Sequence, residues 1–120
     1  MHNLEQIRAA AAFAPAQDLN RAAISRLPGL ILTNGLLAAA AFCNADGGGE
    51  NRKDLKGAMI ATARHLAERG LVKIPDADVI KGLIGHLCEK DSFTLQRATT
   101  EALAYLSFLK RFSKPEKEEP

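Results

Sequence analysis

The chain has 120 residues, with 16 lysines and arginines against 14 aspartates and glutamates and a formal net charge of +2. This length suits one compact domain, and the near-neutral charge excludes a histone-like polycation that coats nucleic acid. Alanine and leucine supply 37 positions, whereas valine and isoleucine supply nine. Because alanine and leucine lose little rotamer freedom in a helix, the composition predicts an all-α fold.

Proline, glycine and polar residues divide the chain into six predicted helices. The helices run over residues 3–14, 17–26, 28–45, 51–69, 76–89 and 93–112. No segment alternates apolar and polar residues with a period of two, so no sheet is predicted. We expect a single-domain bundle over residues 1–113, followed by a disordered charged tail over residues 114–120.

The third predicted helix contains the dipeptide Asn34-Gly35, which between apolar residues is also a strong hairpin signal. Apolar residues keep helical spacing across the dipeptide, so we predict one continuous helix in which Gly35 allows a neighbour to approach closely. Residues 27–45 carry no charge and approach the length of a membrane span. Pro28 and several polar residues interrupt this stretch, which favours a buried central helix and no membrane contact.

The titratable residues form no recognised catalytic or metal-binding pattern. His2, His65 and His86 make no i, i+4 pair, and Cys43 and Cys88 belong to no Cys-x-x-Cys motif. We therefore expect no metal and no cofactor. Both cysteines fall in apolar helical segments and are predicted to be small core residues. No nucleophile, base and orienting group recur at a suitable spacing, so we predict no catalytic residues.

The start of the chain lacks the basic residues and the long apolar stretch of a signal peptide. Together with unpaired cysteines, which suit a reducing compartment, this pattern predicts a cytoplasmic protein.

The last predicted helix has two different faces. Its predicted buried stripe consists of Leu95, Ala98, Ala102, Leu106 and Leu109. The opposite face carries Arg97 and Arg111, which lie about 21 Å apart along the helix. Phe108 lies off the buried stripe, and because a large aromatic side chain is costly to leave in water, Phe108 and Leu103 are predicted to form a subunit interface. A solvated face with an Arg97–Glu101 ion pair is the alternative.

Basic residues recur along the predicted helices at spacings that suit phosphate contacts. The tail contains two lysines and three glutamates, and the remaining body has 14 basic and 11 acidic residues, a net charge of +3. Spaced arginines and lysines hold phosphates without reading sequence, and the pattern predicts no exposed aromatic platform. The predicted phosphate contacts are Arg21, Arg26, Lys53, Arg64, Arg97, Lys110 and Arg111.

Two stretches stand apart from a generic helical sequence: LPGLILTNGLLAAAAF over residues 27–42 and TEALAYLSFLKRF over residues 100–112. Both resemble motifs of the small all-helical subunit of the type III-B CRISPR effector, the Cmr or RAMP-module complex. That family places an aromatic residue at the position of Phe108 and ends in a similar Lys-Arg-Phe sequence. The chain departs from the pattern at Cys43, where the family tends to have lysine, and at Gln96, where it often has an aromatic residue.

The resemblance implies a noncatalytic subunit that stacks with copies of itself and with the large signature subunit along the duplex of guide RNA and target RNA. Target cleavage would belong to the RAMP backbone subunits. The residues fit this role, because head-to-tail packing needs two unlike faces and a scaffold along RNA needs contacts to the backbone only. The alternatives are a helical protein-interaction module that never touches nucleic acid, and a small enzyme with a polar pocket around His65 or His86.

Overall fold

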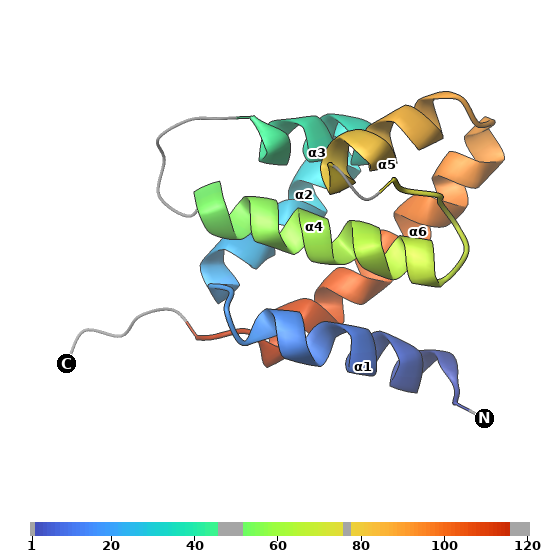
Figure 1. The fold of residues 1–120 in the computed structure, drawn as a ribbon. Coiled ribbons are helices and arrows are strands. Elements are labelled where there is room, and N and C mark those ends of the chain that lie inside the picture. The colour runs from blue at the N-terminus through green and yellow to red at the C-terminus, as the bar shows by residue number, and fades with distance from the viewer. Residues whose placement is uncertain (1, 46–51, 76–77, 116–120) are drawn as a thin grey trace.

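The computed structural model describes residues 2–45, 52–75 and 78–115, and this part of the chain contains six α-helices and no strand (Figure 1). The helices are α1 (Leu4–Ala16), α2 (Arg21–Asn34), α3 (Leu36–Asn44), α4 (Arg52–Glu68), α5 (Val79–Cys88) and α6 (Ser92–Phe112). The predicted all-α bundle of about six helices is confirmed for these residues. None of these helices is long and apolar enough to cross a membrane.

The central helix is α4, because it contacts all five of the other helices. In Figure 1, α1 lies on one side of α4, and α3 and α5 lie on the other. Eight residues of α4 are buried: Leu55, Ala58, Met59, Ala61, Thr62, Ala63, His65 and Leu66. The prediction that residues 28–45 form the central helix is wrong. Small side chains over 17 residues of α4 let neighbours pack on several sides, whereas α3 has only nine residues.

The helix break in the third predicted segment lies at Gly35. This residue ends α2 and precedes α3 with a φ of +94°, a conformation that side chains with a Cβ rarely adopt. The predicted continuous helix over residues 28–45 is therefore wrong. Gly35 also does not serve close packing, since a Cβ placed there meets nothing within 4 Å. The apolar spacing continues across the dipeptide because α2 and α3 each bury one face.

The prolines do not end helices where the sequence predicted. Pro28 lies inside α2, and Pro15 lies in the last turn of α1, which continues to Ala16. The predicted boundary at Arg26 is therefore wrong, and α2 continues to Asn34. Tertiary packing explains this extension, because Leu27 and Ile31 are buried beyond the predicted boundary.

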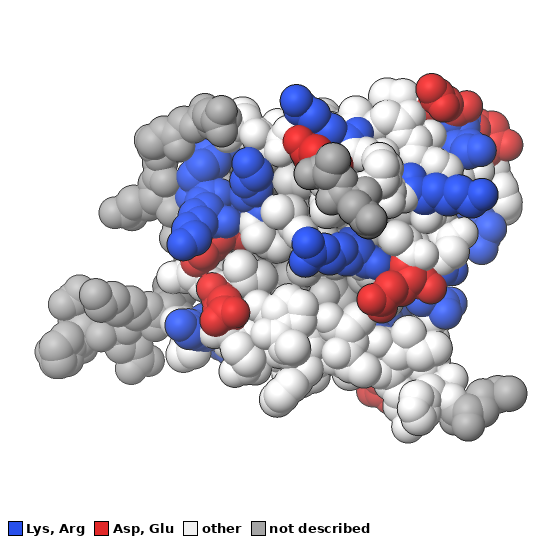
Figure 2. Space-filling view, in the orientation of Figure 1, with Lys and Arg blue, Asp and Glu red and all other residues white. Residues whose placement is uncertain are grey.

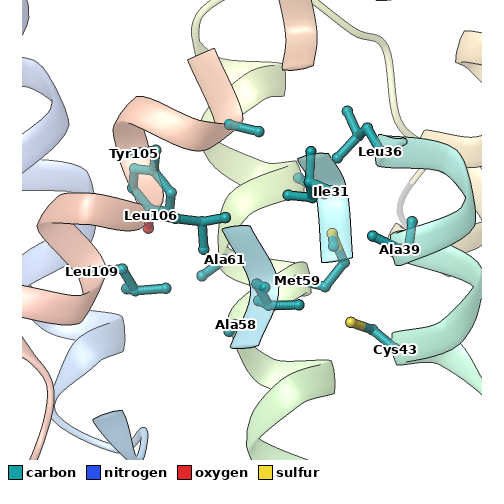
Figure 3. Close-up of a cluster of buried hydrophobic side chains, with 14 of the residues drawn as sticks. Ile31, Leu36, Ala39, Cys43, Ala58, Met59, Ala61, Tyr105, Leu106 and Leu109 are labelled. Carbon is teal, nitrogen blue, oxygen red and sulfur yellow. The ribbon is translucent and has the colours of Figure 1, made fainter. Parts of the chain in front are cut away.

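The core is formed mainly by side chains of α2, α3, α4 and α6 (Figure 3). Its labelled members include Ile31 of α2, Leu36 of α3, Met59 of α4 and Leu106 of α6. The predicted stripe of α6 is confirmed, with four of its residues buried and Leu95 partly buried against the core. This stripe fixes the orientation of α6, and with it the positions of the charged residues on its other face.

The two cysteines differ in environment. Cys43 is buried in α3, as predicted, but Cys88 is exposed at the end of α5. The prediction that both are core residues is wrong for Cys88. Its neighbour Leu87 occupies the buried position instead, and adjacent residues on a helix point about 100° apart.

Backbone hydrogen bonds tie the end of α6 to the start of α2. The Arg21 N–H donates to the Lys114 carbonyl at 2.9 Å, and the Lys114 N–H donates to the Leu19 carbonyl at 3.1 Å. Lys114 and Pro115 of the predicted charged tail are described, whereas residues 116–120 lie outside the described residues, as does the glycine-rich connector at 47–49.

Candidate functional site

Three of the seven predicted phosphate contacts meet at the end of α6. Arg21 of α2 and Lys110 and Arg111 of α6 line, together with Ser107, a surface hollow of about 430 Å³. We call these four residues the α2–α6 hollow. No acidic residue lines it, and no described carboxylate lies within 4.0 Å of its three cations. The hollow is therefore a concentration of positive charge that no described acidic side chain neutralises.

The Arg21 guanidinium is held in place by the end of α6. Its Nε donates to the Lys110 carbonyl at 3.2 Å and its Nη2 donates to the Ser113 carbonyl at 3.0 Å. These bonds use two of the five guanidinium N–H groups and leave three for a ligand. Asn20 fixes the start of α2, since its side chain accepts from the Ala22 N–H at 2.7 Å. The arrangement gives Arg21 a defined direction suited to a phosphate oxygen.

A second basic group surrounds Phe42, between α2, α3 and α4. The guanidinium carbons of Arg26 and Arg52 lie 6.0 and 4.3 Å from the centroid of the Phe42 ring. Lys53 follows Arg52 and is exposed. Figure 2 shows lysine and arginine atoms gathered over the start of α4. Arg52 was not among the predicted contacts, because its partner Phe42 becomes a neighbour only through the fold.

Burial and the two arginines shift the pKa of the Cys43 thiol in opposite directions. Burial of the thiol raises its pKa to about 11, while the positive charges of Arg52 and Arg26 lower it by a smaller amount. Because the thiolate is the reactive form, Cys43 is an inert core residue at neutral pH.

The two remaining predicted contacts lie apart from these groups. Arg64 is exposed on α4 and lines a hollow that also contains Glu68. Arg97 is exposed near the start of α6, with its guanidinium carbon 5.9 Å from the centroid of the Phe93 ring. The alternative of an Arg97–Glu101 ion pair is wrong, because the Glu101 carboxylate is buried and bound to other partners.

The predicted interface residues Leu103 and Phe108 are half-buried and pack against the core. Phe108 also lies beside Phe112, with ring centroids 6.4 Å apart, and Phe112 meets Phe13 of α1 edge-on at 5.5 Å. The prediction that Phe108 points away from the core is wrong, because side chains outside the stripe of α6 also pack against it. We call Phe13, Phe108 and Phe112 the aromatic cluster.

The most exposed aromatic rings are on other residues. Phe13 is 58% exposed and Phe93 is 65% exposed, so the prediction of no exposed aromatic platform is wrong. Phe13 lies in α1 and Phe93 in the first turn of α6. The fold leaves both rings mostly exposed even though Phe13 meets Phe112 of α6, and the spacing of the residues does not show this exposure.

A polar cluster in the interior joins α1, α4 and α6. Arg8 donates to both carboxylate oxygens of Glu101 at 2.8 Å, and the Nε2 of His65 lies 2.8 Å from Oε2 of the same carboxylate. The hydrogen bonds from Arg8, together with the smaller contribution of His65, outweigh burial and lower the pKa of Glu101 to about 2. Since the carboxylate is ionised and only accepts, His65 donates through Nε2.

Tyr105 completes this cluster. Its ring stacks on that of His65 with centroids 4.4 Å apart, and its hydroxyl donates to the Ala11 carbonyl at 3.0 Å. Glu101, His65 and Tyr105 thus each form at least one hydrogen bond to a neighbouring helix. The Nδ1 of His65 is buried and has no partner among the described residues. The cluster is an internal connection between helices, since its charged groups are already satisfied by one another.

The two histidines named in the alternative of a small enzyme, His65 and His86, each line a hollow in the described part of the chain. The hollow that includes His65, of about 710 Å³ between α1 and α4, is lined mainly by alanine, isoleucine, leucine, proline and glycine, and also by His2, Arg64 and Glu68. Within residues 2–45, 52–75 and 78–115, no three side chains of His, Cys, Asp and Glu come close enough together to hold a metal ion.

Comparison with known proteins identifies the family. The family model described as CRISPR-associated protein (Cas_Cmr5) matches residues 4–116, which include all six helices. No curated protein and no solved structure matches the chain. The match confirms the resemblance that the two sequence motifs indicated. The chain therefore belongs to the Cas_Cmr5 family of CRISPR-associated proteins, the small subunits of the type III-B Cmr complex.

Proposed function

We propose that this Cmr subunit is a noncatalytic structural component that lies along the duplex of guide RNA and target RNA and holds its phosphate backbone. Because the chain belongs to the Cas_Cmr5 family, we place it in the Cmr complex. The α2–α6 hollow is the observation that supports contact with RNA. Three cations converge there without a described acidic partner, and two backbone carbonyls orient one of them. A polyanion is the ligand that this charge distribution suits.

The contact we propose is to phosphates and not to base edges. An RNA duplex has a deep and narrow major groove that side chains cannot read, so proteins bind it through its shape and backbone. Lys110 and Arg111 are exposed on the last turn of α6, and Arg21 joins them from α2. Arg26, Arg52 and Lys53 form a second candidate contact near the start of α4. Such contacts position a subunit without selecting a sequence.

We also propose that the subunit stacks on copies of itself and on the large signature subunit and the RAMP backbone subunits, in the cytoplasm. The aromatic cluster is the candidate contact surface, because Phe13 remains 58% exposed at its edge. Aromatic side chains are enriched at protein interfaces, and head-to-tail stacking pairs such a surface with an unlike face of the next copy. Phe108 is the partly buried member of this cluster, and Leu103, also partly buried, is a proposed interface residue on another side of α6.

The decisive experiment measures RNA binding in the reconstituted complex. Lys110→Gln combined with Arg111→Gln removes two cations of the α2–α6 hollow, and Lys81→Gln removes an exposed cation of α5 as a matched control. Each lost phosphate contact lowers the slope of log affinity against log salt concentration by about 0.7 to 0.9, so the double variant is expected to lower it by about 1.4 to 1.8. The control keeps the wild-type slope.

An unchanged slope in the double variant would contradict RNA contact at this surface. Unchanged RNA affinity after further loss of Arg26 and Lys53, in a complex that assembles normally, would favour the alternative of a protein-interaction module. Thermal unfolding of each variant by circular dichroism separates these outcomes from misfolding.

A further inference from the structure

The start of α6 carries an exposed aromatic ring among cations. Phe93 lies in the first turn of α6 and is 65% exposed, and Arg97 lies one turn later with its guanidinium carbon 5.9 Å from the ring centroid. A ring of this size left in water costs free energy that a binding partner recovers.

Two adjacent hollows on this surface share Arg97. One, of about 420 Å³, is lined by Phe93, Arg97 and Arg69, among others. The other, of about 290 Å³, is lined by Lys73, Lys90 and Arg97, among others. We call Phe93, Arg69, Lys73, Lys90 and Arg97 the Phe93 platform.

The four cations of the Phe93 platform form no ion pair with a described acidic residue, although the charge of Lys90 contributes to lowering the pKa of its neighbour Asp91. None of its four cations has a described carboxylate within 4.0 Å. Glu101 lines one of the two hollows, but its carboxylate is already bound by Arg8 and His65. The surface therefore combines a flat apolar ring with a positive field, which is the combination that binds single-stranded nucleic acid by base stacking and phosphate contacts.

We propose that Phe93 is a stacking platform for an unpaired RNA base, and that Lys73, Lys90 and Arg97 hold the phosphates that flank this base. The proposal rests on the proposed function, in which the subunit lies along RNA. It adds a second site with a different ligand, since Arg97 and Arg111 are about 21 Å apart along α6. The α2–α6 hollow would hold paired RNA by its backbone, while the Phe93 platform would recognise a base that is not paired.

The test uses the reconstituted complex and two RNA duplexes, one with a single bulged 2-aminopurine and one with the same base paired. Phe93→Ala is expected to weaken binding of the bulged RNA by about 5- to 150-fold, to abolish the stacking-dependent quenching of 2-aminopurine fluorescence, and to leave the paired RNA unaffected. Phe93→Trp keeps a stacking surface, so binding of the bulged RNA and quenching of the 2-aminopurine fluorescence are both retained. Phe93→Leu keeps an apolar side chain without a π-face and behaves as Phe93→Ala.

Several outcomes would overturn the proposal. Wild-type quenching in Phe93→Ala, or full retention of binding in Phe93→Leu, excludes base stacking. Loss of a partner subunit from Phe93→Ala complexes, with RNA binding unchanged, assigns the platform to a protein. The Lys110→Gln and Arg111→Gln double variant separates this proposal from the proposed function. If the double variant weakens binding of both RNAs and Phe93→Ala has no effect, only the platform fails, whereas both fail if neither change affects RNA binding.

Discussion

Arg8 of α1 and Glu101 of α6 are 93 residues apart in the chain and share two hydrogen bonds of 2.8 Å. Glu101 also accepts from His65 of α4, so one carboxylate joins three helices. The Glu101 side chain is only 9% exposed, and removing a partner from such a pair leaves a buried group unsatisfied. This connection holds α1 against α4 and α6. It thereby also helps to position Phe13, the member of the aromatic cluster that lies on α1.

Glu101→Gln is expected to lower the free energy of unfolding at pH 7 by about 2–4 kcal/mol. Urea denaturation of the isolated chain measures this change. The conservative replacement keeps the volume of the side chain and removes the charge that Arg8 and His65 bind. An unchanged free energy of unfolding would show that the connection contributes nothing to stability.

The same carboxylate makes the stability of the protein depend on acid pH. The pKa of Glu101 is lowered in the folded chain from 4.5 to about 2, mainly by the hydrogen bonds from Arg8. The unfolded chain therefore binds more protons than the folded chain between these values, and the stabilisation is complete above about pH 5 and is lost as the pH falls toward 2. In Glu101→Gln, the unfolding free energy should fall less over this range than in the wild type.

Gly29 and Gly35 should respond to replacement by alanine in opposite directions. Gly35 has a φ of +94°, so Gly35→Ala should destabilise the fold by about 1–3 kcal/mol through backbone strain. Gly29 lies inside α2 where a Cβ meets nothing within 4 Å, so Gly29→Ala should stabilise it by about 0.5–1 kcal/mol. Melting temperatures that shift in the same direction for both variants would contradict the placement of the break at Gly35.

The two thiols should react at very different rates. Cys88 is exposed, whereas Cys43 is buried and its pKa is raised to about 11 by that burial. A chromogenic disulfide reagent at pH 8 is expected to modify one thiol per chain rapidly, and the second only after unfolding in denaturant. Cys88→Ser removes the fast phase and serves as the control. Rapid reaction of two thiols in the native wild type would show that Cys43 is accessible.

Replacing Phe13 or Phe108 by alanine should distinguish an effect on subunit assembly from an effect on the stability of the chain. Phe108→Ala removes a ring that is partly buried against the core and should cost about 1–3 kcal/mol in unfolding free energy. Phe13→Ala removes a ring that is 58% exposed and should cost about 1 kcal/mol or less. If the aromatic cluster is a subunit contact, both variants reduce co-purification with the other subunits. Normal co-purification of Phe13→Ala would remove the cluster from the proposed interface.

Helical periodicity made some features of this protein predictable from the sequence. The buried stripe of α6 and the apolar face of α5 follow from residues three and four positions apart, which lie on one face of a helix wherever that helix is placed. The same local rules could not choose between Pro28 and Gly35 as the helix break. Both residues disturb a helix, and burial of Leu27 and Ile31 beyond the predicted end decided the outcome.

The sequence by itself determined the helical fold class, the face of α6 that carries Arg97 and Arg111 and, through two motifs, the family. Only the tertiary structure brought Arg21 beside Lys110 and Arg111, turned Glu101 inward to Arg8, and left Phe93 exposed next to Arg97. The physical reason is the range of the interactions. Helix formation and the pattern of its faces depend on neighbours within one or two turns, whereas the grouping of charges and the exposure of a ring depend on which distant helix packs beside them.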